Sequence, residues 1–356
     1  MSVLTRTIRA TLLAVLTLST SGCYYGELAS GQLRMLWRRE AIESVRADPD
    51  RPASTRDLLG LVESVRDFAR GLGLDVGSQY KSYVEWPGDR VVTTLVRTRP
   101  GSLEPVPWRY PLLGRLPYRG YFDRAKAEAE ALRLREREGF DVCETGVTAY
   151  STLGWLADPV TSPMLERGPA SLVETLLHEL VHATAFLPDA ADFNESVAQF
   201  VGQQATIRFF DAAARGEIAI PPDLAWPETA RVRAHIEDRR LIAESVLAFR
   251  DRLAALEGAA ERDAQRDELE QQARASLRAL PLVVLDPERV AEAARLSDAC
   301  LALSGTYARE LPRHEAVYRA LGEDLEAMIA RLVRIAEEEA PAERFFADVP
   351  NASVRD

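Results

Sequence analysis

The sequence predicts an α+β fold that is predominantly helical, with a small antiparallel sheet and a protruding helical hairpin. Apolar residues recur at helical spacing through most of the chain. Strand-like composition is confined to residues 80–122 and 146–155, where β-branched residues, aromatics, Pro and Gly gather. Residues 229–280 are rich in Arg, Glu and Ala and repeat their apolar residues at coiled-coil spacing. Gly258 lies near their midpoint, which is typical of a helical hairpin.

The first residues are typical of an export signal and not of a folded element. Arg6 and Arg9 precede the apolar run 10–18, which is shorter than the about 20 residues that span a bilayer. The run leads into "STSGC", and a cysteine after small residues is similar to a bacterial lipobox. We therefore predict a lipoprotein signal peptide over residues 1–22 and acylation of Cys23, which would anchor the protein to a membrane. The tyrosine after the cysteine favours the outer membrane, with the protein facing the periplasm; a secreted or periplasmic protein is the alternative.

The composition fits a single domain over residues 23–356, with residues 229–280 as a hairpin insertion. A hydrophobic content of 47% supports a sizeable core, and 28% charged residues support a soluble surface. The net charge of −11 argues against nucleic-acid binding, because phosphates attract basic proteins. The sequence gives no indication of an oligomeric state.

The N-terminal half is expected to combine helices with short strands. Apolar spacing predicts helices over residues 24–47 and 56–73, separated by "DPDRPAST". Residues 80–122 contain "RVVTTLVRT" and a segment rich in Pro, Gly and aromatics, which predict short strands joined by ordered turns. A charged helix is expected over residues 123–139, and "GVTAYSTLGW" at 146–155 predicts a further strand.

The C-terminal half is expected to be helical. The Gly-Pro pair at 168–169 opens a strongly apolar helix, since Pro is favoured in a first turn, and "FLPDAADF" interrupts it after Phe186. The asparagine of "FNES" can cap the next helix, expected over about residues 194–210. The charge pattern of the hairpin 229–280 indicates a solvated face, and two or three helices follow over residues 287–339.

Two cysteines remain if Cys23 is acylated. Cys143 and Cys300 could pair in an oxidising periplasm. Because the sequence does not show that they are close, a disulfide and two buried free thiols remain alternative interpretations.

The stretch "LLHELVHATAF", residues 176–186, carries two of the four histidines of the chain. On a helix, His178 and His182 would lie on one face, about 5–6 Å apart at Cβ, where both imidazoles can reach one ion. Glu179 would point to the adjacent side and could act as a base on a water held there, as in zinc sites of the H-E-x-x-H type. The alternative is an ordinary buried helix. However, three ionisable groups on so apolar a helix are costly to bury unless a cation compensates them.

A catalytic zinc site needs a third protein ligand and one position left open for water. "FNESVAQF" offers Glu195 in the expected first turn of the next helix, where the helix dipole favours a carboxylate. Asp189 and Asp192, in the loop between the two helices, are alternative ligands. Asn194 is expected to be a helix cap, and Glu195 could also be an acid that only helps to cap its helix.

Several of these segments resemble a known family. "HELVHATAF…FNESVAQFVG" is similar to the glutamate-zincin pattern H-E-x-x-H…N-E-x-x-A, and the chain more narrowly resembles a bacterial lipoprotein family of predicted aminopeptidases. "GQLRML", "WRYPLLGRLPYRGYFD", "GVTAYSTLGWLADP" and "TYARELPRHEAVY" also resemble segments of that family, so the likeness covers most of residues 23–330. The gap between His182 and Glu195 is shorter than in the best-known peptidases of the wider clan, so their substrate pocket is not carried over.

The resemblance implies a zincin-like pair of active-site helices and zinc-dependent hydrolysis of peptide bonds by an aminopeptidase. It implies that His178, His182 and Glu195 hold Zn²⁺ and that Glu179 is the general base. It also implies a peptide substrate, and the acyl group on Cys23 would supply the membrane contact.

A hydrogen-bond donor for the carbonyl oxygen is also expected, because negative charge develops there during hydrolysis. Related zinc peptidases often use a Tyr or His from a later helix. Tyr307, in a segment that resembles the family, is the first candidate, and His314 is the second; a core tyrosine is the alternative for Tyr307. "VTAYSTLGW" could be an edge strand that pairs with an extended peptide, or a plain core strand.

Two other functions remain open from the sequence. The protein could be a surface lipoprotein that binds a partner through the hairpin 229–280 and keeps a vestigial metal site. It could also hydrolyse cell-wall peptide bridges with the same chemistry, although the sequence contains no separate wall-binding module. No residue is assigned to recognise a free peptide amine, so exopeptidase activity rests on the resemblance and endopeptidase activity remains an alternative.

Overall fold

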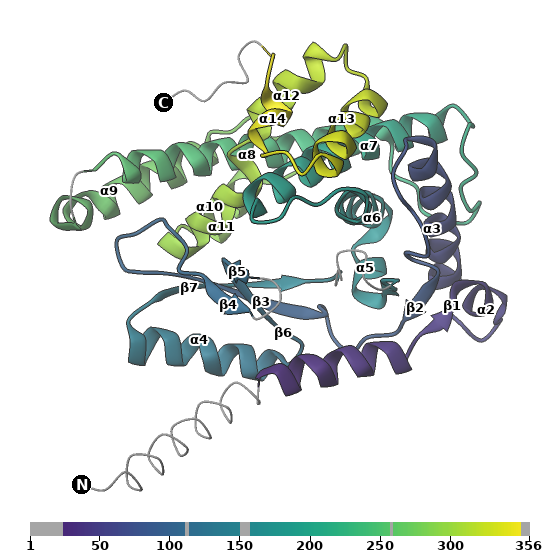
Figure 1. Cartoon of the computed structure of the whole chain (residues 1–356), viewed down its shortest axis with the longest axis horizontal. Helices are drawn as coiled ribbons and strands as arrows, with labels where there is room; N and C mark the ends of the chain where they lie inside the picture. The colour runs from purple at the N-terminus through teal and green to yellow at the C-terminus, as the bar shows by residue number, and fades with distance from the viewer. Residues whose placement is uncertain (1–23, 111–113, 150–156, 257–258, 350–356) are drawn as a thin grey trace, which may run out of the picture.

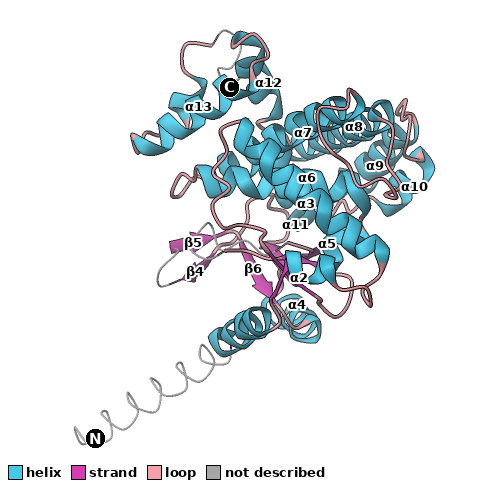
Figure 2. Cartoon of the chain, turned by 90° about the vertical axis from the view of Figure 1, so that its right-hand side faces the viewer, coloured by secondary structure: helices cyan, strands magenta, loops and turns pink. Residues whose placement is uncertain are grey.

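The computed structural model describes residues 24–110, 114–149, 157–256 and 259–349, and it has the predominantly helical α+β fold that the sequence predicts. Two perpendicular views show a layer of helices above three small sheets. Helix 24–37 and α4 (Arg124–Glu138) lie on the opposite side of the sheets (Figures 1 and 2). The other helices are α2 (Ile42–Ala47), α3 (Ala53–Gly71), α5 (Ser162–Glu166), α6 (Gly168–Thr184), α7 (Ala191–Ala214), α8 (Thr229–Ala254), α9 (Ala259–Arg278), α10 (Pro287–Ala293), α11 (Asp298–Ala308), α12 (Leu311–Ala320), α13 (Leu325–Glu337) and α14 (Glu343–Phe346).

The three sheets are small and mostly antiparallel. β3 (Val92–Thr98) is the centre of an antiparallel sheet, with β6 (Tyr118–Tyr121) and β7 (Asp141–Val147) on either side. β4 (Trp108–Tyr110) and β5 (Gly114–Leu116) form an antiparallel hairpin. β2 (Ser82–Val84) pairs antiparallel with β1 (Glu40–Ala41) but parallel with β8 (Val160–Thr161). The antiparallel prediction therefore holds except for β2 and β8, whose parallel pairing requires the long crossover that separates them.

Two expected segments differ from the structure in their bounds. The helix expected over residues 24–47 is split into helix 24–37 and α2, with β1 between them. The strand expected at 146–155 begins earlier, because β7 starts at Asp141. Residues 150–156, which carry most of the suggested edge strand, lie outside the described residues, as do the signal peptide and Cys23.

The main core surrounds α7. The hydrophobic side chains of α7 point in all directions, as expected of a helix that is covered on every side. α3, α6, α12 and α13 pack around it, and Phe200, Phe209 and Phe210 are among its fully buried side chains. In the described part of the chain, no helix combines the length and the apolar character needed to cross a membrane.

The predicted helical hairpin is formed by α8 and α9. Near the start of α8, Val232 and Ile236 belong to the main core. Further along, apolar residues of α8 and α9 form a second core. Leu301 of α11 and Leu296, which precedes α11, belong to the same cluster. The far end of the hairpin projects from the body, whereas its base is anchored along the helical layer (Figure 1).

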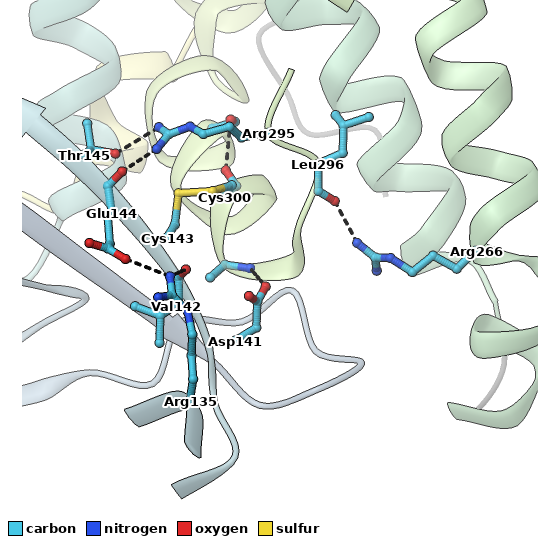
Figure 3. Close-up of a disulfide and its surroundings, with 12 residues drawn as sticks. Arg135, Asp141, Val142, Cys143, Glu144, Thr145, Arg266, Arg295, Leu296 and Cys300 are labelled. Carbon is cyan, nitrogen blue, oxygen red and sulfur yellow. Dashed lines mark hydrogen bonds and ion pairs between the residues drawn. A yellow bond between two sulfur atoms is a disulfide. The ribbon is translucent and has the colours of Figure 1, made fainter. Parts of the chain in front are cut away.

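A disulfide joins β7 to α11. Cys143 and Cys300 are bonded, which decides between the two interpretations left open by the sequence (Figure 3). Beside it, the Asp141 carboxylate accepts a hydrogen bond from the backbone N–H of Ala299 at 2.8 Å, and Arg295 donates to the carbonyl oxygen of Glu144. These contacts hold the beginning of α11 against the sheet, and the same helix carries Tyr307 at its other end.

Candidate metal centre

α6 and α7 approach each other closely at the histidine pair. The Gly-Pro start predicted for α6 is present, and the helix carries His178 and His182 four residues apart. α7 crosses it at Gly202, where an added Cβ would lie 3.2 Å from the backbone N and Cα of His178. Any larger residue at this position would push the two helices apart. No local sequence pattern marks Gly202, since its role depends on a contact between two helices.

The predicted ligand residues converge. The Nε2 atoms of His178 and His182 lie 3.1 Å apart, and a Glu195 carboxylate oxygen lies 3.5 Å from the first and 3.6 Å from the second. The two imidazole rings are nearly perpendicular, at 84°. Among the described residues, this is the group of three potential ligands that the structure brings together, with all three ligand atoms within 4.8 Å of one another.

These distances fit a metal ion. Four ligands at the usual zinc–nitrogen and zinc–oxygen distances of about 2.0–2.2 Å form a tetrahedron whose corners are about 3.3–3.6 Å apart. The three separations at this site are close to that value. Two imidazole nitrogens with one carboxylate oxygen are also a known donor set for catalytic zinc, with the fourth position left for water or substrate. The residues present can therefore hold such an ion without rearranging their backbone.

Asn194 closes the loop that brings Glu195 to the histidines, and it is not the helix cap that we predicted. Its side-chain oxygen accepts a hydrogen bond from the N–H of Leu187 at 3.0 Å, and its side-chain nitrogen donates to the carbonyl of Leu187 at 2.7 Å. α7 begins earlier, at Ala191, so Glu195 lies in the second turn and not in the first. The helix dipole therefore contributes less at Glu195 than expected, because its effect fades beyond the first turn.

The other predicted ligands lie elsewhere. Asp189 and Asp192 are exposed and do not join the cluster. Of the three candidate acids, Glu195 is the one that lies beside both histidines.

Charges in the site shift the pKa values of its members. Burial alone would lower the pKa of His178, but the hydrogen bond with Glu195 and the negative charges of Glu179 and Glu195 outweigh it and raise that pKa. Burial likewise opposes ionisation of Glu195, but hydrogen bonds and charge from both histidines hold its pKa well below the ordinary value. The carboxylate is therefore the charged form at neutral pH. The buried Nδ1 of His182 has no hydrogen-bond partner in the described part of the chain.

The negative charge of Glu179 acts on three tyrosines. Burial raises the pKa of Tyr80, Tyr118 and Tyr307, and the negative charge of Glu179 raises each of them further. The Tyr307 hydroxyl is hydrogen-bonded to Glu195, although 37% of the whole side chain is exposed. The pKa shift of Tyr307 thus reflects its hydroxyl end, which lies within the site.

Tyr307 was a candidate from the sequence, whereas Tyr80 and Tyr118 were not. Tyr118 belongs to a segment already quoted for its family resemblance, which could have served as a signal. Tyr80 has a φ of +58°, which is unusual for an aromatic residue, and no sequence pattern marks it.

A small pocket adjoins Glu195. Tyr118 and Tyr307 form two of its walls, and the rest of its lining is mostly apolar, from the sheet, the loops beside it and α11. The other lining residues are Val96, Pro105, Pro117, Leu303 and Thr306.

The structure does not bring His314, the second candidate donor, to the site. It is fully buried on α12, and its Nε2 lies 2.9 Å from the hydroxyl of Ser196. Phe193 and Phe345 pack against its ring. Burial, with a smaller effect of Arg313, lowers the pKa of His314 to about 3. His314 is a neutral core residue, and Tyr307 remains the donor candidate.

Comparison with known proteins identifies the family. No curated protein sequence matches the chain, and no solved structure matches it either. A family model described as "Putative aminopeptidase" matches residues 23–346, which is nearly the whole chain and includes both site helices. The protein therefore belongs to this aminopeptidase family.

Proposed function

We propose that the protein is a zinc-dependent peptidase, and more narrowly an aminopeptidase. The observation that carries the proposal is the convergence of His178 Nε2, His182 Nε2 and a Glu195 oxygen, with Glu179 next to the first histidine. Membership of an aminopeptidase family supports a peptide substrate. A zinc ion held by the three ligands would supply a Lewis acid and would lower the pKa of a water molecule to roughly 7.

The residues of the chain then have distinct roles in hydrolysis. Glu179 takes one proton from the attacking water and delivers it to the leaving amine, so that water adds OH to the carbonyl carbon and H to the nitrogen. Tyr307 donates a hydrogen bond from its hydroxyl to the carbonyl oxygen as negative charge develops there. This role requires a protonated hydroxyl, which tyrosine has at neutral pH at its ordinary pKa, and burial raises the pKa of Tyr307 further.

A test compares the zinc content and peptide hydrolysis of the wild type and Glu179→Gln. Because Glu179 is not a ligand, the variant should keep its zinc and lose about 10²–10⁴-fold in kcat. Asp192→Asn, which removes an exposed carboxylate of α7 outside the cluster, is the matched control and should leave both quantities unchanged. Peptides with a free or an acetylated N-terminus distinguish aminopeptidase from endopeptidase activity. Bound zinc without hydrolysis of any peptide in a broad library would contradict the proposal and favour partner binding through the hairpin.

We further propose that the chain is anchored by acylation of Cys23 and faces the periplasm from the outer membrane, as the "STSGC" sequence predicts. The disulfide between Cys143 and Cys300 supports an oxidising compartment. Mass spectrometry of the N-terminal peptide, with fractionation of wild type and Cys23→Ser, tests this. Retention of both forms in the same membrane fraction, without an acyl group on the peptide, would contradict it.

A further inference from the structure

Helix 24–37 presents a large apolar surface to solvent. Tyr25, Leu33, Leu36 and Trp37 are all exposed, and Trp37 is 83% exposed. The described residues contain eight exposed large hydrophobic side chains, and these four are half of them. Such a concentration on one short helix marks an interaction surface and not the scattered exposure usual in soluble proteins.

The exposed side chains share one face of the helix. At about 100° per residue, they span about 120° of the helix circumference, together with Gly26 and Ala29. No charged residue lies within this arc. The buried residues Tyr24 and Met35 lie on the opposite side. We call the face formed by Tyr25, Gly26, Ala29, Leu33, Leu36 and Trp37 the apolar face.

The helix is held firmly in this orientation. Gly31 lies against the ring of Phe122, where an added Cβ would come within 2.2 Å of the ring. The Glu27 carboxylate accepts a hydrogen bond at 2.9 Å from the backbone N–H of Asp123, and Met35 is fully buried. The apolar face therefore cannot be turned inward by a simple rotation of the helix.

α4 provides a contrast on the same side of the molecule. Both helices lie below the sheets in two views (Figures 1 and 2). The outward side of α4 is densely charged, as is usual for a solvated helix. Its exposed charged residues include Arg124, Lys126, Glu128, Arg135 and Glu136. Among the described residues, α4 carries one exposed large hydrophobic side chain, Leu132 at 52%, against four on helix 24–37, so apolar exposure on this side of the protein is concentrated on helix 24–37.

We propose that the apolar face lies on the surface of a lipid bilayer, with the helix in the interface plane. The helix is about 21 Å long, too short to span the about 30 Å hydrocarbon core, but well suited to lie on it. Tryptophan prefers the membrane interface, which explains why Trp37 can be so exposed. The exposed Arg34 lies about 60° beyond the Trp37 edge of the face and can pair with an anionic headgroup, which matters for a chain whose net charge is −11.

The position of the helix in the chain favours a bilayer over other occupants. It starts directly after Cys23, the predicted acylation site, so the acyl chains and the apolar face would enter the same membrane. Two weak membrane contacts side by side bind much more firmly than one. The proposal concerns attachment and orientation, and it does not depend on the proposed peptidase activity.

Tryptophan fluorescence tests the position of Trp37. The full chain is reconstituted into phosphatidylethanolamine vesicles that contain phosphatidylglycerol and brominated acyl chains, which quench indoles at the membrane. We expect clear quenching in the wild type and loss of most of it in Trp37→Phe, which keeps an apolar side chain but removes this indole. Equal quenching in both proteins, or none in vesicle-bound wild type, would overturn the proposal.

Vesicle binding without the acyl group separates the helix from the lipid anchor. The Cys23→Ser chain should still sediment with anionic vesicles, and adding Leu33→Ser, Leu36→Ser and Trp37→Ser should weaken this about tenfold or more. Val283→Ser, at a residue that is 78% exposed elsewhere on the surface, is the matched control and should bind like its parent. Equal binding of the triple serine variant and its parent, or a solution dimer that the triple variant abolishes, would overturn the bilayer assignment.

Discussion

α7 separates two groups of histidines that have opposite properties. Glu195 and Ser196 are neighbours on this helix. On the α6 side, Glu195 lies 3.5 Å from His178 and 3.6 Å from His182. On the α12 side, the Ser196 hydroxyl lies 2.9 Å from Nε2 of His314. Two adjacent residues of one helix thus define a candidate metal centre and a packed core.

Partners, and not burial, distinguish the two groups. Burial tends to lower the pKa of His178 and of His314 alike. Two carboxylates reverse that tendency at His178, whereas at His314 burial prevails, Arg313 adds to it, and the ring stays neutral with a pKa of about 3. A buried histidine is therefore a candidate metal ligand when acids converge on it, and is typical of a core position when aromatic rings surround it.

The largest expected effect comes from removing one ligand. His182→Ala should lose the bound zinc and reduce kcat/KM by at least about 10³-fold, because the remaining imidazole and carboxylate bind a divalent ion far more weakly. The folded structure should persist, because the His182 side chain is not part of the hydrophobic cluster that packs α6 against α7. Zinc content by elemental analysis and circular dichroism check both points. A variant that keeps stoichiometric zinc would contradict the metal assignment.

The corresponding change on the other side of α7 should affect stability instead. His314→Ala removes a fully buried ring from between phenylalanines and leaves the Ser196 hydroxyl without one of its partners. We expect the free energy of unfolding to fall by about 2–4 kcal/mol, with zinc content and kcat/KM near wild type. Urea denaturation measures the first quantity. Loss of zinc in a folded His314→Ala protein would show that His314 supports the candidate metal centre as well as the core.

The sequence predicted which residues form the candidate metal centre better than it predicted the packing around them. His178, His182 and Glu195 were identifiable because their residue types and spacing encode a chemical requirement, and the structure brings them together. Asn194 was misassigned because a helix cap and a loop clamp use the same side-chain groups, and only the fold shows that they reach Leu187.

Long-range contacts account for the remaining differences. The pairing of Cys143 with Cys300 joins residues that are 157 positions apart, so no local pattern could decide it. His314 was a reasonable candidate by residue type, but its environment is set by Phe193 and Phe345 from two other helices. The helical class, in contrast, follows from local periodicity and was predicted correctly.

The pH dependence of the free energy of unfolding should further distinguish His314 from the histidines of the candidate metal centre. The pKa of His314 falls from 6.5 in the unfolded chain to about 3 in the folded one. As the pH falls below 6.5, the unfolded chain binds a proton that the folded one does not, so stability decreases by about 1.4 kcal/mol per pH unit until about pH 3. Between pH 7 and 5 this amounts to about 2 kcal/mol, present at neutral pH and lost in acid.

Unfolding of wild type and His314→Gln at several pH values measures this difference. The variant should lose about 2 kcal/mol less than the wild type between pH 7 and 5. Glu310 and Arg313, the charged neighbours of the ring, remain in both proteins, so their titration cancels in the comparison. Parallel stability curves for the two proteins would show that His314 is not the buried neutral group that its surroundings indicate.

The smallest expected effect lies at the contact between α6 and α7. Gly202→Ala places a Cβ 3.2 Å from the backbone of His178, which can move only together with its helix. The shift should weaken zinc binding about tenfold, whereas the free energy of unfolding should change by less than about 1 kcal/mol, since alanine is the better helix former. Gly26→Ala, where an added Cβ meets no other atom within 4 Å, is the matched control. It should leave zinc affinity unchanged. Competition with a chelator measures the zinc affinity. Equal zinc affinities of Gly202→Ala and Gly26→Ala would mean that the close helix crossing does not set the ligand geometry.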